Sequence, residues 1–173
     1  MSLTTKKRTK PLLTAERLRE VLNYDPETGL FRWLKKLADR TRLNAVAGSK
    51  TEHGHCVIRI DGRVYSCHRL AWLYVHGRWP SDQIDHINWV RDDTRIANLR
   101  ECSNAENNQN RRGIGVSFNK RRSKWKAEIC VNYHRIFLGE FRDKESAIKA
   151  YYAAKIKLHP FWNQSEAASG VPS

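Results

Sequence analysis

The alternating pattern between residues 115 and 141 constrains the fold more than any other feature of the sequence. Three segments alternate apolar and polar side chains, GVSFN, KWKAEICV and HRIFLGEF, and the short polar stretches RRS and NY separate them. A period of two predicts strands, and such short connections predict antiparallel neighbours. Asp143 is then placed as the N-cap of a last helix. The side chains that share one face of that helix are Ala147, Tyr151, Ala154 and Leu158. We therefore expect a three-stranded antiparallel sheet packed on one helix.

The first half of the chain mixes short helices with short strands. Thr14 is placed as an N-cap, with Leu13 and Leu18 around it as the hydrophobic staple of a short helix. The segment YDPETG has the composition of a turn, and LFRW after it is expected to be a strand. Farther along, HRLAWLYVHG predicts a mostly buried helix that Gly77 ends. The fold class that follows is α+β.

Four cysteines are present, and none of them forms a Cys-x-x-Cys pair, so a zinc ribbon is not supported. The segment CVIRI-DG-RVYSC predicts two strands joined by an Asp-Gly turn. Counting outward from that turn places Cys56 opposite Cys67. We interpret this pair as packing. A metal site completed by His55 and His68 is the alternative, although four ligands on one hairpin rarely reach tetrahedral geometry.

The positive charge of the chain limits the classes of partner that it can bind. Lysine and arginine total 32 against 18 acidic residues, a formal net charge of +14. Residues 108–163 alone hold 13 basic and 4 acidic side chains. Such a balance indicates a polyanionic partner, either nucleic acid or an anionic membrane surface. No apolar run approaches the roughly 20 residues of a spanning helix, so we expect no membrane. The basic N-terminus lacks the apolar core of a signal peptide, which predicts a reducing cytoplasm and free thiols.

The stretch QIDHINWVRDDTRIANLR, residues 83–100, groups residues that can carry chemistry. Asp85 and His86 end a short apolar run, and a polar loop then leads to Asn98. A Ser-x-x-Glu capping box predicts that a helix starts at residue 104, with Asn107 about one turn inside it. A polar loop and a solvated helix face would also show such residues, so the spacing alone leaves both interpretations open.

These residue types meet the requirements of phosphodiester hydrolysis. A divalent cation needs hard oxygen ligands, which Asp85 and the amide carbonyl of Asn107 can supply. The attacking water needs a base that titrates near neutrality, and His86 is such a group. The other imidazole nitrogen needs a fixed acceptor, which Asn98 could provide. The four residues therefore form a candidate hydrolytic site.

The segment DHINWVRDDTRIANLRECSNAENNQN resembles the HNH endonucleases, in particular the homing-endonuclease branch in which Asn replaces the last His. HRLAW at 68–72 fits that branch too, and the resemblance covers residues 56–110. It implies a ββα-metal fold in which Asp85 and Asn107 bind Mg²⁺, with Mn²⁺ as the alternative ion and zinc not expected. It also implies that His86 is the general base and that Asn98 orients it.

Two further residues stand out in this resemblance. Trp89 occupies a loop position where the family often has Gly. His68 is a further candidate catalytic residue, because its place before RLAW could put it beside the scissile phosphate. A structural hydrogen bond is the other interpretation of His68, since buried polar side chains usually have such a partner.

Residues 114–162 resemble a second family, the plant ethylene-response-factor (APETALA-type) DNA-binding domain. The matching residues are Gly115, Val116, Trp125, Ala127, Glu128, Ile129, Leu138, Gly139, Phe141, Ala147, Ala150, Tyr151, Ala153 and Ala154. The resemblance implies that the sheet lies in the major groove of DNA. The candidate DNA contacts are Arg121, Arg122, Lys124, Trp125, Lys126 and Arg135. Arginine can read guanine edges and lysine mostly pairs with phosphates, whereas a merely solubilising basic surface is the alternative. The sequence leaves open whether Trp125 belongs to the core or contacts a sugar of the DNA.

Together these features predict a homing-type, metal-dependent endonuclease of double-stranded DNA that acts as a monomer on its substrate. We expect a nuclease region at 1–110, a DNA-binding domain at 114–163 and a disordered tail at 164–173. The family resemblance implies a phage or mobile-element protein in the cytoplasm of a bacterial or phage-infected cell. The alternative function is a DNA-binding regulator with a relic nuclease domain. A ribonuclease or a colicin-like toxin would not need a separate sheet that reads a duplex.

Overall fold

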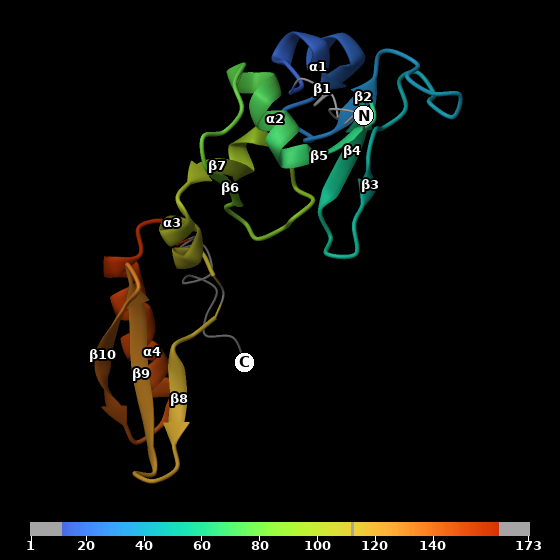
Figure 1. Cartoon of the computed structure of the whole chain (residues 1–173). Coiled ribbons are helices and arrows are strands. Elements are labelled where there is room, and N and C mark those ends of the chain that lie inside the picture. Colours follow the sequence, from blue (N-terminus) through green and yellow to red (C-terminus); the bar gives the residue numbers. More distant parts are fainter. Residues whose placement is uncertain (1–11, 112, 163–173) are drawn as a thin grey trace, which may run out of the picture. The chain divides into compact units, whose positions relative to one another are not determined.

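The computed structural model describes residues 12–111 and 113–162, so the tail expected to be disordered lies outside the described residues. Both helices and strands are present, which confirms the α+β class (Figure 1). The chain divides into two compact units that interleave along the sequence. The described part of the first unit is 12–80 with 91–97, and that of the second is 81–90 with 98–111 and 113–162.

The elements of the first unit are α1 (Ala15–Val21), β1 (Leu22–Tyr24), β2 (Phe31–Trp33), β3 (Ser49–Lys50), β4 (Cys56–Ile60), β5 (Arg63–Ser66) and α2 (Cys67–His76). Those of the second unit are β6 (Gln83–His86), β7 (Leu99–Cys102), α3 (Asn104–Gln109), β8 (Val116–Asn119), β9 (Lys124–Val131), β10 (His134–Phe141) and α4 (Lys144–Leu158). The 3-10 helix η1 (Ile96–Asn98) has its first two residues in the first unit and Asn98 in the second.

The first unit packs α1 and α2 over short antiparallel strands. The side chain of Thr14 accepts a hydrogen bond from Arg17 N at 3.2 Å, which confirms the expected N-cap. Gly77 ends α2 with φ at 71°, a left-handed conformation that glycine adopts at little cost. Leu18, Phe31 and Leu70 are almost fully buried. This unit therefore has an apolar core of its own.

The hairpin of β4 and β5 follows the predicted register. Ile60 pairs with Arg63 and Val57 with Ser66, so the next position outward faces Cys56 toward Cys67. The hairpin prediction placed Cys67 in the second strand, but Cys67 is the first residue of α2. Ser66 keeps an extended backbone as the N-cap, and the helix starts directly after it. The second strand is therefore one residue shorter than expected.

The second unit begins with the antiparallel pair of β6 and β7, and α3 packs against both strands. Ser103 caps α3 in the predicted capping box. Its side chain accepts from Glu106 N, and the Glu106 carboxylate accepts from Ser103 N at 2.7 Å. The capping box thereby fixes the start of α3 and places Asn107 one turn inside, as expected.

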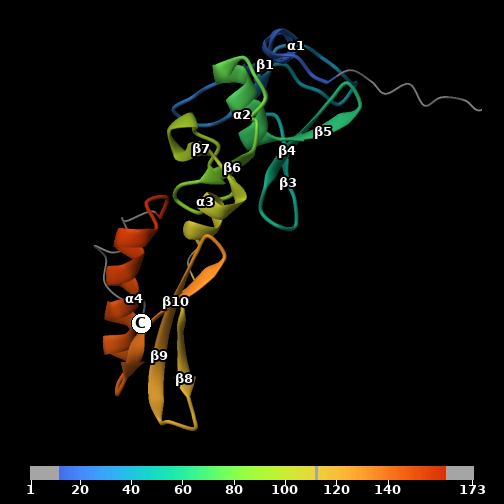
Figure 2. The same cartoon turned by 60° about the vertical axis from the view of Figure 1, so that its left-hand side comes forward.

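The strands β8, β9 and β10 form the predicted three-stranded antiparallel sheet, and α4 covers one of its faces (Figures 1 and 2). Asp143 caps α4 by accepting from Ser146 N at 2.7 Å. Gly115 lies against β9, where an added Cβ would approach Glu128 O to 1.9 Å. No residue with a side chain fits there without a shift of the backbone.

The buried face of α4 differs from the prediction at its end. Ala147, Tyr151 and Ala154 are buried, but Leu158 is 37% exposed. His159, the residue after Leu158, takes the position that faces the sheet, and its ring hydrogen-bonds Cys130 O at 2.9 Å. Lys155 is buried as well, and its ammonium group donates to Arg111 O at 2.7 Å.

Candidate active site

Strand β6 brings Asp85 and His86 into a buried position at its end. Both residues are 7% exposed. In the ladder with β7, Asp85 lies opposite Arg100 and His86 lies opposite Leu99. Because side chains alternate along a strand, Asp85 shares its face with Gln83, whereas His86 points to the other face.

Three hydrogen bonds hold the Asp85 carboxylate. Arg100 donates from Nε at 3.0 Å and from Nη2 at 2.8 Å, and Asn110 donates from Nδ2 at 2.9 Å. All three end on Oδ2, so among the described residues Oδ1 is the oxygen left to face a cation. The guanidinium of Arg100 also lies over the ring of Phe161, at 4.7 Å from its centroid, and donates to Phe161 O.

Sequence reasoning missed Arg100 and Asn110 as neighbours of Asp85. Arg100 could have been found from the ladder, because it lies directly across from Asp85 once the two strands pair. Asn110 could have been found from the helix, because residues three apart lie on one face. Asn110 is 2% exposed, as expected for an amide that serves the fold.

Asn107 lies beside Gln83, the first residue of β6, whose side chain is on the same face of the strand as that of Asp85. Its Nδ2 donates to Gln83 Oε1 at 2.6 Å. This bond directs the amino group of the amide toward Gln83 and turns its carbonyl oxygen away. Asn107 projects from α3 and Asp85 projects from β6, and these two elements are in contact. The side-chain oxygen of Asn107 and Oδ1 of Asp85 take no part in the hydrogen bonds described above.

Asn98 closes the loop that follows His86. Its side-chain oxygen accepts from Asn88 N at 3.0 Å, and its backbone oxygen accepts from Ile87 N at 2.9 Å. Both donors directly follow His86 in the chain. Asn98 therefore fixes the backbone on the C-terminal side of the candidate base.

Trp89 adopts the backbone conformation that a glycine would favour at this loop position. Its φ is 61°, and its backbone N–H donates to His86 O at 3.0 Å. The indole Nε1 donates to Asn110 O. A bulky residue with positive φ carries backbone strain, and this indole hydrogen bond, which a glycine could not make, helps to offset it.

His68 belongs to the first unit, as the second residue of α2. It is half-buried, and its ring centroid lies 5.8 Å from that of His55. Both interpretations of His68, at a scissile phosphate or in a structural hydrogen bond, stay predictions.

The donor atoms at Asp85 and Asn107 fit a hard divalent cation. Mg²⁺ prefers oxygen ligands and is commonly held by one or two carboxylates together with water. Within residues 12–111 and 113–162, no group of three or more His, Cys, Asp or Glu side chains is arranged to hold a metal ion, the set of His55, Cys56, Cys67 and His68 included. The candidate site is of another kind, because it combines the carboxylate of Asp85 with the amide oxygen of Asn107.

The face of the C-terminal sheet that α4 leaves uncovered carries most of the predicted DNA contacts. Ala127 and Ile129 of β9 are buried on the α4 side, so Lys124 and Lys126 point to the uncovered side. Arg135 pairs with Cys130 in the ladder and shares that side. The three basic side chains thus gather on one face.

Two carboxylates partly neutralise this face. Lys126 Nζ lies 2.5 Å from Glu128, and Arg122 Nη1 lies 3.2 Å from Glu140. Arg121 stands in the turn between β8 and β9, where Asn119 Oδ1 accepts from its backbone N–H at 3.1 Å. Exposed ion pairs of this kind are weak, so a phosphate can compete for the same cations.

Trp125 lies on the α4 side of the sheet. Its ring centroid is 5.1 Å from that of Phe118, and Lys144 Nζ lies 5.7 Å from the Trp125 ring centroid. The ring is therefore part of the packing between the sheet and the first turn of α4.

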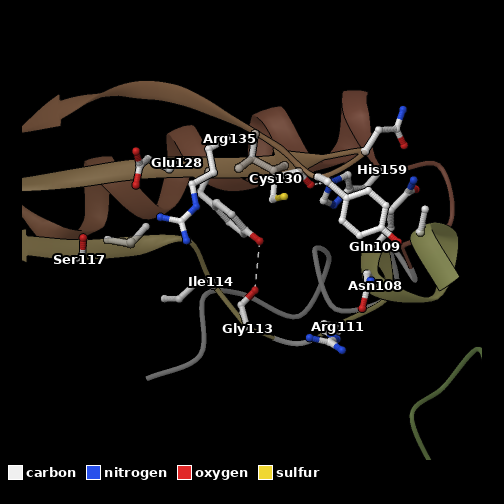
Figure 3. A pocket seen from close by; sticks show the side chains of 17 residues that line it. Asn108, Gln109, Arg111, Gly113, Ile114, Ser117, Glu128, Cys130, Arg135 and His159 are labelled. Carbon is white, nitrogen blue, oxygen red and sulfur yellow. Dashed lines mark hydrogen bonds between the residues drawn. The ribbon is translucent and has the colours of Figure 1, made fainter.

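A cavity of about 640 Å³ opens beside this sheet (Figure 3). Arg111, Asn108 and Gln109 line it from α3 and the residues that follow, and Arg135 and Cys130 line it from the strands. Tyr151 donates to Gly113 O across its wall at 3.1 Å. The lining mixes apolar and polar side chains and includes the guanidinium groups of Arg111 and Arg135, which can bind phosphate.

Comparison with known proteins identifies part of the chain. Residues 65–109 match the family model described as HNH endonuclease. The matched range contains Asp85, His86, Asn98 and Asn107 and supports a nuclease that acts on DNA. HNH nucleases generally depend on a divalent metal ion. Neither the curated proteins nor the solved structures gave a match to this chain. In the described ranges, no helix has both the length and the apolar character needed to cross a bilayer.

Proposed function

We propose that the protein is a metal-dependent, site-specific DNA endonuclease of the homing type. The observation that carries this proposal is the adjacent pair Asp85 and His86, buried at the end of β6 inside the range that matches the HNH endonuclease model. Asp85 offers a carboxylate ligand for a cation on the side of α3, and His86, the next residue along the strand, offers a base.

The proposed roles follow from the positions of the side chains. Asp85 and Asn107 hold Mg²⁺, or Mn²⁺ in its place, in a ββα-metal arrangement built from β6, β7 and α3. The bound ion supplies stabilisation of negative charge on the phosphate and on the departing oxygen. His86 accepts the proton of the attacking water, and Asn98 orients His86 by fixing the loop after it. Arg100 and Asn110 fix the rotation of the Asp85 carboxylate through Oδ2, which would leave Oδ1 for the ion.

The second part of the proposal concerns recognition of the duplex. Residues 114–163 act as an ethylene-response-factor-like domain whose uncovered sheet face lies in the major groove of double-stranded DNA. Arg121, Arg122 and Arg135 contact bases or phosphates, while Lys124 and Lys126 contact phosphates. The protein binds as a monomer and, with one candidate active site among the described residues, cuts one strand at a time. Carriage by a phage or mobile element and action in the cytoplasm are parts of the same proposal.

A second function is favoured by one observation. The guanidinium of Arg100 already neutralises Asp85 in this structure, at 2.8 Å. A protein that never binds an ion at Asp85 would need such a counter-charge permanently. In that case the chain would be a DNA-binding regulator with a relic nuclease domain.

Incubation with supercoiled plasmid separates the two functions. The substrate is a plasmid pool with inserts of random sequence, and the reactions contain Mg²⁺, Mn²⁺ or EDTA. The endonuclease produces nicked or linear plasmid only with a divalent ion, and sequencing of the ends returns a shared site. A regulator retards the DNA in a gel and leaves every plasmid supercoiled under all three conditions.

The DNA-binding face is tested by the salt dependence of binding. Arg121→Gln, Arg122→Gln and Arg135→Gln should each weaken binding to duplex DNA. Loss of a phosphate contact should lower the slope of log K against log salt by about one. Lys149→Gln is the matched control, because Lys149 lies on α4 and pairs with Glu145 at 2.7 Å. Equal effects of the control and the three arginine variants would contradict the assignment of this face.

A further inference from the structure

Two thiols of the first unit are in direct contact. Cys56 begins β4 and Cys67 begins α2, and their sulfur atoms lie 2.8 Å apart without being bonded. Gly48, the residue before β3, makes room for Cys56, since a Cβ there would approach Cys56 Sγ to 2.8 Å. The backbone therefore presents the two sulfurs to each other, at 2.8 Å against the roughly 2.05 Å of a disulfide bond.

The surroundings give the two sulfurs different roles. Cys67 is 1% exposed, whereas Cys56 is half-buried, so a small reagent reaches Cys56 first. The Cys67 S–H donates to Cys56, which lowers the pKa of Cys56 and raises that of Cys67. Lys50, the ladder partner of Cys56, also lowers the pKa of Cys56, whereas burial of the thiol and the charge of Asp92 oppose this. Cys56 is thus the more acidic thiol of the pair, and the thiolate is the reactive form of a cysteine.

We propose that Cys56 and Cys67 are an oxidative modification site that forms a reversible intramolecular disulfide with a small peroxide as the oxidant. The Cys56 thiolate attacks one peroxide oxygen, the O–O bond breaks, and Cys56 becomes a sulfenic acid while hydroxide leaves. The Cys67 sulfur then attacks the Cys56 sulfur, and the hydroxyl departs with the Cys67 proton as water. In sum, two thiols and one hydrogen peroxide give one disulfide and two waters.

The other two cysteines of the chain provide internal comparisons. Cys102 is buried, and its burial raises its pKa to about 11, so it is an unreactive thiol. Cys130 is exposed and is the thiol that any added oxidant meets first. Site-selective pairing of Cys56 with Cys67 is therefore distinguishable from general oxidation. The proposal concerns the first unit alone and does not depend on nuclease activity.

The test uses the full-length protein treated with a small excess of hydrogen peroxide under native conditions. The sample is then denatured in N-ethylmaleimide, digested with trypsin without reductant and analysed by mass spectrometry. Trypsin cuts after Lys50, Arg59, Arg63 and Arg69, so the two cysteines fall in separate peptides. We expect the peptide TEHGHCVIR joined to VYSCHR, and dithiothreitol should release both.

Variants make the assignment specific. Cys56→Ser should abolish the joined peptide and leave Cys67 alkylated, whereas Cys130→Ser should leave the joined peptide unchanged. The oxidised wild type should also melt several degrees higher than the reduced protein, because the bridge restricts the unfolded chain, and Cys56→Ser should lose this shift. Complete alkylation of Cys56 and Cys67 in a sample whose Cys130 has been oxidised would overturn the proposal. Pairing of either cysteine with Cys130 would overturn it equally.

Discussion

The charge balance around Asp85 decides how the candidate site behaves at the scale of single residues. Its carboxylate is buried and paired with Arg100 at 2.8 Å, with side chains 8% and 23% exposed. Removing one partner of such a pair leaves an uncompensated charge, which is strongly destabilising. A divalent cation at Oδ1 would add a second positive charge next to the guanidinium. Ion binding at Asp85 and the ion pair with Arg100 are therefore coupled.

Replacing Arg100 by Met should make the protein more responsive to metal. Without the guanidinium, the Asp85 charge lacks its counter-ion, and at an effective dielectric constant of about 20 such a contact corresponds to about 4 kcal/mol. We expect the variant to melt below the wild type without metal and to gain more in melting temperature from Mg²⁺ or Mn²⁺. Scanning calorimetry with and without the ion measures both shifts. Equal metal-induced shifts in the two proteins would show that Arg100 and the ion do not share Asp85.

Asp85→Ala and Asn107→Ala should each remove metal-dependent cleavage. Each substitution deletes one of the two proposed protein ligands, and an ion that stabilises the transferring phosphate contributes several kcal/mol. The expected loss in rate is about a hundredfold or more at millimolar Mg²⁺. Asn108→Ala is the control, because Asn108 is the neighbour of Asn107 on α3 and lines the cavity beside the sheet instead. Wild-type rates in both ligand variants would refute the metal site.

At the scale of elements, caps and alternation made much of the fold predictable. Thr14, Ser103, Asp143 and Gly77 mark helix ends by local chemistry, so their roles could be predicted from the sequence. The Arg100 and Asn110 contacts to Asp85 could be predicted only after the pairing of β6 with β7 and the position of α3 had been assigned. The buried lysine Lys155 was missed for a related reason. Its ammonium group is satisfied by Arg111 O and by the rings of Tyr151 and Trp162, which are distant in sequence or on another turn.

The end of α4 should make stability depend on pH. Burial lowers the pKa of His159, and the charge of Lys155 contributes, while the bond to Cys130 O opposes the shift. The unfolded chain therefore binds the proton more tightly than the folded chain, and the free energy of unfolding falls as pH drops below about 6.5. Between pH 7 and pH 5, His159→Gln should lose less free energy of unfolding than the wild type, as measured by urea denaturation. His55, whose pKa burial also lowers, accounts for part of the loss that remains. An identical pH dependence in both proteins would contradict this assignment.

At the scale of the whole molecule, the charge is distributed according to the proposed division of labour. The C-terminal segment 108–163 holds 13 basic side chains against 4 acidic ones, and none of the four residues of the proposed hydrolytic set. Binding to the DNA backbone should therefore depend on that segment and fall steeply with salt. Hydrolysis should depend on β6, β7 and α3. Affinity for DNA and the rate of cutting are thus separable quantities in this protein.

The most direct test of the account is the cleavage rate of His86→Ala on supercoiled plasmid with Mg²⁺, measured together with the affinity for the same DNA. His53→Ala is the matched control, since His53 is an exposed histidine of the first unit with 74% of its side chain accessible. If His86 is the general base, His86→Ala should lose about 10²–10⁴-fold in rate at neutral pH, with an affinity close to that of the wild type. The control should retain both. Cleavage by His86→Ala at the wild-type rate would contradict the role of His86 as the general base and, with it, the proposed mechanism.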